Sequence, residues 1–125
     1  MQMKSKSLRG FLGSKNFETS RQFYLDLGFR ESNINPTMSF FMVDDTLAFY
    51  LQDYYVKDWI ENTMMFLEVE NVQQYYQEIT SKQLPDTYPA VNITSIKYED
   101  WGQEFHMLDP AGVLWHFGSF EEKEV

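Results

Sequence analysis

A chain of 125 residues is long enough to bury one hydrophobic core but too short for two independent domains. Its 19 acidic and 10 basic residues give a net charge of -9, which disfavours nucleic acid and anionic membrane surfaces as partners and favours cationic or neutral ligands. There is no cysteine, so disulfides, thiolate zinc sites and a cysteine nucleophile are excluded.

The first half of the chain predicts a strand, a helix and a hairpin, in that order. Residues 8–13 are a predicted strand, Asn16 is a predicted helix N-cap, and Gly28 should end the helix. The apolar runs 38–43 and 46–51 flank a turn, which is typical of a β-hairpin. One face of the helix should be buried, because its residues recur at helical spacing: Ser20, Phe23, Tyr24 and Leu27.

The second half repeats this order. Residues 64–69 are a predicted strand, and Asn71 followed by Gln74 has the spacing of a helix capping box. A further strand is predicted near 92–98, and a final hairpin over 104–117. The helix between them should bury a second stripe at the same spacing: Val72, Tyr75, Tyr76 and Ile79.

The repeat spans about 55 residues, and neither half could bury its own apolar face alone. We therefore predict a single domain over residues 1–125 that is built from two similar modules. The predicted boundaries are module one at 7–52, a connector at 53–62, module two at 63–119 and an acidic tail at 120–125.

Two motifs, "SRQFYLDLGF" at 20–29 and "WGQEFHMLDPAGVLWHFG" at 101–118, resemble the vicinal oxygen chelate superfamily. This superfamily includes glyoxalase I, extradiol dioxygenases and bleomycin resistance proteins, and the chain is most similar to the bleomycin-resistance-like members. The resemblance covers residues 7–119 and implies an α+β fold. Two βαβββ modules would form one curled, mixed-sheet domain around a central cleft, commonly completed by a homodimer.

Enzymes of this superfamily hold a divalent metal at four positions, which fall here on Arg9, Tyr50, Met64 and His116. Only His116 is a good ligand, and an arginine would repel a cation because it stays protonated. The resemblance therefore implies neither a bound metal nor a cofactor in this chain. Other carboxylates could act as improvised ligands, although each is more often simply solvated: Glu68, Glu70, Asp100 and Glu104.

The final hairpin can be sorted into two faces if Leu108 pairs with Val113 across the turn. The face with His116 should then line the cleft. The opposite face carries His106, Leu108 and Val113 together with Trp115 and Phe117, and the last two should pack under the helices. The same alternation places side chains of the earlier strands in the cleft. The predicted ligand-binding residues are Arg9, Phe11, Tyr50, Met64, Phe66, Phe105, Met107, Leu114 and His116.

These predicted cleft residues are mostly apolar or aromatic, and a few carry polar groups, as a pocket for a flat organic molecule requires. The leading hypothesis is a metal-free small-molecule binding protein of the glyoxalase/bleomycin-resistance type that sequesters an aromatic or cationic ligand. A second is a metal-dependent lyase, isomerase or dioxygenase that uses His116. A third is a structural or regulatory module whose own side chains fill the cleft.

The expected partners are a small-molecule ligand and a second copy of the chain. No apolar run approaches the roughly 18 residues of a membrane span, so no membrane partner is expected. Arg9 and Gly10 interrupt the apolar residues of the basic N-terminal segment, which is therefore unlike a signal peptide. Together these features predict a cytoplasmic protein.

Overall fold

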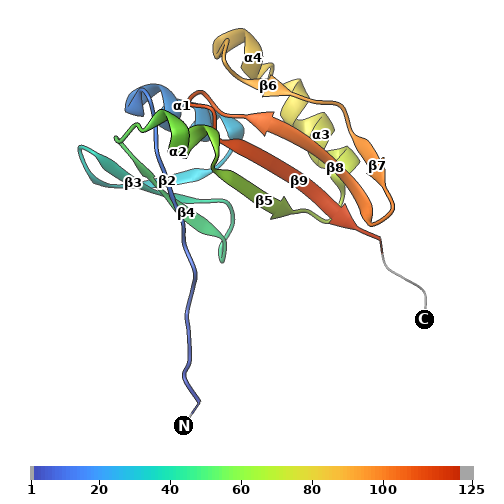
Figure 1. The fold of residues 1–125 in the computed structure, drawn as a ribbon, viewed down its shortest axis with the longest axis horizontal. Coiled ribbons are helices and arrows are strands. Elements are labelled where there is room, and N and C mark those ends of the chain that lie inside the picture. The colour runs from blue at the N-terminus through green and yellow to red at the C-terminus, as the bar shows by residue number, and fades with distance from the viewer. Residues whose placement is uncertain (1, 122–125) are drawn as a thin grey trace.

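Two open, mixed β-sheets make up the fold, and the two longer helices lie together on one side of them (Figure 1). The computed structural model describes residues 2–121. The first sheet has the strand order β1-β4-β3-β2, with β1 parallel to β4 and the other pairs antiparallel. Its elements are β1 (Phe11–Leu12), α1 (Phe17–Leu27), β2 (Arg30–Asn35), β3 (Met38–Met42) and β4 (Ala48–Gln52).

The second sheet has the order β5-β9-β8-β6, and β7 also pairs with β8. Strand β5 runs parallel to β9, as β1 does to β4. The outer strand predicted near 92–98 is interrupted, so that two short strands share one neighbour. The elements of this half are β5 (Met64–Glu68), α3 (Val72–Ser81), α4 (Leu84–Thr87), β6 (Asn92–Ile93), β7 (Lys97–Glu99), β8 (Gly102–Leu108) and β9 (Leu114–Phe120).

Each half thus runs strand, helix, strands, which confirms the predicted α+β fold of two βαβββ modules. Helix α2 (Lys57–Glu61) lies in the segment predicted as the connector. Strand β9 continues to Phe120, and residues 122–125 of the predicted tail lie outside the described residues. None of the helices within residues 2–121 has the length and apolar character that crossing a membrane requires.

Local side-chain chemistry explains where the two main helices begin and end. Asn16 accepts a hydrogen bond from the backbone amide of Thr19 at 3.1 Å, and Asn71 accepts one from Gln74 at 2.9 Å. These side chains satisfy amides that a helix N-terminus leaves unpaired. Helix α1 ends at Gly28, whose φ of 112° is a left-handed conformation that glycine adopts without steric cost. The predicted face of α1 is buried along its whole length.

A buried hydrogen-bond network joins the two modules. The Tyr24 hydroxyl on α1 donates to Asp109 Oδ2 at 2.6 Å, and the indole nitrogen of Trp115 on β9 donates to the Tyr24 oxygen at 3.0 Å. The other Asp109 oxygen accepts the backbone amides of Ala111, Gly112 and Val113, each at 2.9 Å. The Asp109 carboxyl is therefore fully buried but well supplied with donors.

Burial shifts the titration of this network. It raises the pKa of the Asp109 carboxyl, while the hydrogen bonds from Tyr24 and from the loop amides oppose that rise. It also raises the pKa of the Tyr24 hydroxyl, with a further contribution from the neighbouring Asp109. The raised pKa keeps the Tyr24 phenol protonated, so that it remains a hydrogen-bond donor to Asp109.

We expect Tyr24→Phe to lower the free energy of unfolding by about 2–3 kcal/mol, because it leaves buried polar atoms of both Asp109 and Trp115 without a partner. The matched control is Tyr88→Phe, which removes one partly buried hydrogen bond to Asp26 and should cost about 1 kcal/mol. Urea unfolding of both variants provides the measurement. An equal or smaller loss for Tyr24→Phe would contradict the role assigned to the network.

Candidate functional site

The loop between β8 and β9 is longer than the sequence pattern suggests. The backbone amide of Asp109 donates to the Val113 carbonyl at 3.0 Å, and strand pairing resumes at Leu108 opposite Leu114. The predicted pairing of Leu108 with Val113 is therefore wrong by one residue. Because side chains alternate along a strand, this shift moves every β8 side chain to the other face relative to β9.

Phe105 and Met107 consequently do not share a face with His116. Both are fully buried under the helices, where Phe105 lies 4.9 Å from Phe117 between ring centroids. Their predicted position in the cleft is corrected by this register. His106, which was predicted on the opposite face of the hairpin, lies instead on the face of His116.

His106 and His116 are direct cross-strand neighbours on this face. The backbone amide and carbonyl of His106 both bond to Thr94, at 2.9 Å each, so the histidine pair is a non-hydrogen-bonded one. Side chains come closer together at such pairs. The two imidazole ring centroids are accordingly 4.4 Å apart.

Glu104 joins the two histidines, because it precedes His106 by two residues and so shares its face. Its Oε1 lies 2.8 Å from His106 Nε2, and its Oε2 lies 3.5 Å from His116 Nδ1. The three side chains, here called the Glu-His-His cluster, remain partly exposed, at 14% for Glu104, 21% for His106 and 20% for His116. One carboxylate thus bridges two imidazoles at the sheet surface.

Beside this cluster lies an aromatic shelf formed by Phe66, Trp101 and Phe120. Phe66 is nearly parallel to the His116 ring, with centroids 6.1 Å apart and an interplanar angle of 24°. Trp101 and Phe120 lie 6.3 and 5.7 Å from Phe66. The shelf is open to solvent, with exposed fractions of 46% for Phe66, 36% for Trp101 and 55% for Phe120.

Two further predicted residues accompany the shelf on the second sheet. Met64 pairs with Leu114, just as Phe66 pairs with His116 on the same two strands. Met64 is 63% exposed and Leu114 is partly buried. Met64, Phe66, Leu114 and His116 are therefore together as predicted, whereas Trp101 and Phe120 are additional members of this surface.

The remaining predicted residues gather on the first sheet. The Arg9 guanidinium lies 4.6 Å from the centre of the Phe40 ring and donates to the Tyr50 hydroxyl at 3.0 Å. Phe11 stacks on Tyr50 with centroids 4.8 Å apart. Arg9 and Tyr50, at two of the superfamily's metal positions, thus bond to each other, and a protonated guanidinium at such a position opposes cation binding.

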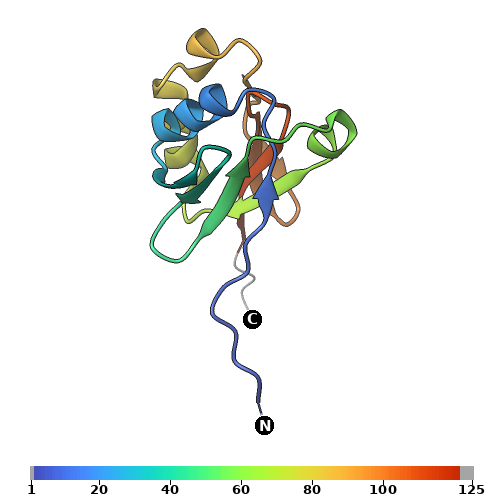
Figure 2. The same cartoon turned by 90° about the vertical axis from the view of Figure 1, so that its left-hand side faces the viewer.

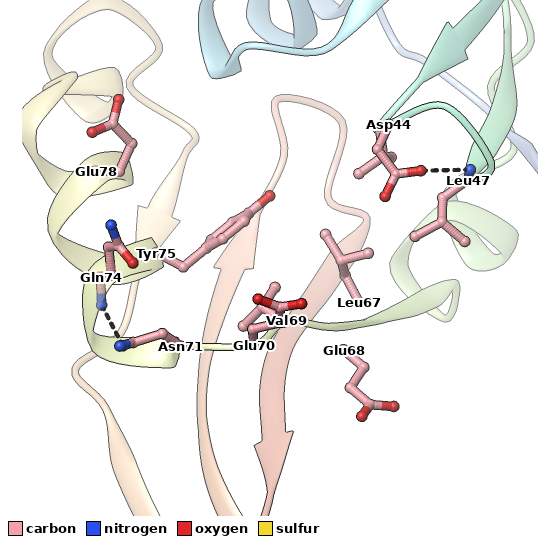
Figure 3. A pocket seen from close by; sticks show the side chains of 11 residues that line it. Asp44, Leu47, Leu67, Glu68, Val69, Glu70, Asn71, Gln74, Tyr75 and Glu78 are labelled. Carbon is pink, nitrogen blue, oxygen red and sulfur yellow. Dashed lines mark hydrogen bonds between the residues drawn. The ribbon is translucent and has the colours of Figure 1, made fainter.

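A separate open groove of about 600 Å³ lies between the modules (Figure 3). It is bordered by the β3–β4 loop on one side and by β5 and α3 on the other. Its lining includes the carboxylates of Asp44, Glu68, Glu70 and Glu78, and one aromatic ring, Tyr75. Burial, together with the charge of Asp44, raises the pKa of the Tyr75 hydroxyl. The groove suits a cationic group, but none of the predicted ligand-binding residues lines it.

Several solved structures share this fold. The bleomycin-binding protein of bleomycin-producing Streptomyces verticillus, solved with copper(II)-bleomycin, is 21% identical, with a TM-score of 0.80 over 96% of this chain and 100% of that chain. The bleomycin resistance determinant encoded on the transposon Tn5 is 17% identical, with a TM-score of 0.72 over 94% of this chain and 100% of that one. An antibiotic-binding protein from Streptomyces sp. CB03234 is 14% identical, with a TM-score of 0.74 over 96% and 100% of the two chains.

These likenesses confirm the predicted fold, which this chain shares with bleomycin-binding and bleomycin resistance proteins. No protein-family model matches the chain, and no curated protein matches it by sequence. Fold similarity does not establish activity, which depends on the side chains of the site. In this chain, the side chains that could bind a ligand are those of the Glu-His-His cluster, the aromatic shelf and the first-sheet residues.

Two glycines of the β8–β9 pair provide a test of how the shelf is built. A Cβ at Gly118 would lie 2.7 Å from the tip of the Phe66 ring, which can move aside. A Cβ at Gly102 would lie 1.9 Å from the Ser119 carbonyl oxygen, and Gly102 has a φ of +154°. We expect Gly118→Ala to cost about 1 kcal/mol of stability and Gly102→Ala about 3 kcal/mol or more.

Urea unfolding should rank the two variants, and NMR should show a chemical-shift change at His116 in Gly118→Ala as the Phe66 ring moves. Equal destabilisation by the two alanines, or an unchanged His116 spectrum, would contradict this arrangement.

Proposed function

We propose that this chain binds a small organic molecule on the uncovered face of its second sheet and sequesters it without chemical change. The observation that carries the proposal is the aromatic shelf. Large apolar side chains that remain exposed side by side are typical of an interaction site. Rings of this kind supply contact area, and a few polar groups then fix the orientation of the ligand.

The surroundings favour a ligand that combines a planar ring with a positive charge. The chain has a net charge of -9. His116 is a neighbour both of the Glu104 carboxylate and of the shelf residue Phe66, so a negative charge lies near the shelf. A negative surface raises the local concentration of cationic ligands. On the first sheet, Arg9 instead suits a carbonyl or carboxylate group of the same ligand.

The solved neighbours support this ligand class as the first to test. Two of them are described as proteins of bleomycin binding or resistance, and a third as an antibiotic-binding protein. Stacking of rings needs no metal. Binding by the proposed mechanism should therefore persist in the presence of a chelator.

We also propose that the chain acts in the cytoplasm as a homodimer, in which a second copy completes the cleft. The N-terminal residues extend away from the body of the protein (Figure 2). Met3 and Leu8 in this segment are 87% and 98% exposed. A second copy would cover apolar surface here and over the open sheet faces, which provides the driving force for association.

Isothermal titration with bleomycin and other planar cationic compounds tests the ligand proposal. We expect Trp101→Ala and Phe66→Ala to weaken binding roughly tenfold, because each removes one stacking surface. The matched control is Trp59→Ala, since Trp59 is 66% exposed on α2, outside the shelf. Uniform absence of binding, or an equal loss in the Trp59 variant, would count against the proposal.

Sedimentation velocity over a range of concentrations tests the dimer. We expect the mass of two chains at micromolar concentration, and a shift toward the monomer when Leu8 and Met3 are replaced by serine, because these changes reduce the apolar area available for burial. A monomer at every concentration would contradict this part of the proposal.

A further inference from the structure

The Glu-His-His cluster has the composition and placement of a metal site. Within residues 2–121, Glu104, His106 and His116 form a group whose possible ligand atoms all lie within 4.8 Å of one another. The chain has only two histidines, and the β8–β9 register places them directly opposite each other. We propose that these three side chains bind a late first-row divalent cation such as Zn²⁺, Ni²⁺ or Cu²⁺.

The donor set selects this class of ion. Imidazole nitrogens combined with a carboxylate suit zinc, copper, nickel and iron, whereas magnesium and calcium prefer sites made of oxygen alone. Two histidines and one carboxylate also form the ligand set of several catalytic zinc sites and of non-haem iron sites. The cluster therefore offers three protein ligands and leaves further coordination positions open.

The possible donor atoms lie within 4.8 Å of one another, so side-chain rotations would have to bring them to the spacing of a metal site. Ligand bonds of about 2.0–2.2 Å in a tetrahedron place the donor atoms roughly 3.3–3.5 Å apart. The Glu104 oxygens lie 2.8 and 3.5 Å from the nitrogens of His106 and His116. Without a metal, the Glu104 carboxylate hydrogen-bonds to His106 and lies within ion-pair distance of His116, and a cation would take the place of those contacts.

The backbone supports the ligands firmly. Strand β8 lies between β9 on one side and β6 and β7 on the other, so the cluster stands on central strands. Two hydrogen bonds to Thr94 hold the backbone of His106. The His106 amide donates to Thr94 Oγ1, and the Thr94 amide donates to the His106 carbonyl, each at 2.9 Å. Sites that stand on strands are held more accurately than sites on loops. Little of the ligand affinity would therefore be lost to ordering the chain.

This site differs from the metal positions that the superfamily resemblance implies. Of those positions only His116 belongs to the cluster, while Arg9 and Tyr50 bond to each other on the first sheet. Glu104 and His106 come from β8. The ring of Phe66 lies beside His116, so the aromatic shelf adjoins the Glu-His-His cluster.

The charge of Lys97 provides an independent test of cation binding at the cluster. It lies opposite Glu104 on β7, and side chains of directly paired residues share a face. A lysine ammonium on this face repels a bound cation. Replacing it with a neutral residue should therefore strengthen metal binding, whereas a change that only loosened the sheet would weaken it.

The test is titration of ZnCl₂ and NiCl₂ into the untagged full-length chain after treatment with a chelator. We expect one ion per chain and no comparable binding of Mg²⁺. His106→Ala, His116→Ala and Glu104→Gln should each weaken Zn²⁺ binding roughly tenfold or more, because each removes a ligand. Lys97→Gln should strengthen it a few-fold. Glu61→Gln, at the exposed end of α2 and outside the second sheet, is the matched carboxylate control and should leave Zn²⁺ binding unchanged.

Two further measurements keep the outcome clear if a variant folds poorly. Circular dichroism checks the fold of each variant, and NMR of the wild-type chain should show that Zn²⁺ shifts the signals of both imidazoles together. Absence of binding, or binding that shifts neither imidazole and survives in the histidine variants, would overturn the proposal. No organic ligand is used, so this result is independent of the proposed small-molecule binding.

Discussion

The buried carboxylate of Asp109 is the constraint on which the geometry of this protein depends. A carboxylate without exposure to solvent is tolerated only if donors surround it. Three amides of its own loop and the hydroxyl of Tyr24 meet that demand. The same bonds set the length of the loop and tie it to helix α1. The register of β8 on β9 follows, and with it the pairing of the two histidines.

Periodicity and end signals were enough to predict the two longer helices, α1 and α3, with their N-caps, and most strands, whereas the short helices α2 and α4 were not predicted. Strand β2 was not predicted, because its sequence RESNIN is polar and its support is non-local. Glu31 on β2 accepts hydrogen bonds from Arg21 on α1 and from Ser39 on β3. Those contacts hold the pKa of Glu31 below its usual range. Such partners are distant in sequence, so no local pattern reveals them.

The functional face was predictable only in part, for a related reason. Met64 and Phe66 on β5 lie beside Leu114 and His116 on β9, because the parallel pairing places them opposite each other. The side chains of β8 were assigned to the wrong face, because alternation is identical for either hairpin pairing. His106 was therefore missed as a partner of His116. Trp101 sits in a turn, outside any strand pattern, and joins the shelf only through tertiary packing.

The length of the 109–113 loop has a consequence for how this surface can change through evolution. Surface loops usually accept insertions and deletions easily. Removing one residue here would exchange the two faces of β8, exposing Phe105 and Met107 and burying His106. Substitutions can retune the chemistry of the sheet face one position at a time, but a change in chain length at this turn would replace that chemistry entirely. We therefore expect the 109–113 loop to tolerate substitutions but not insertions or deletions of a single residue.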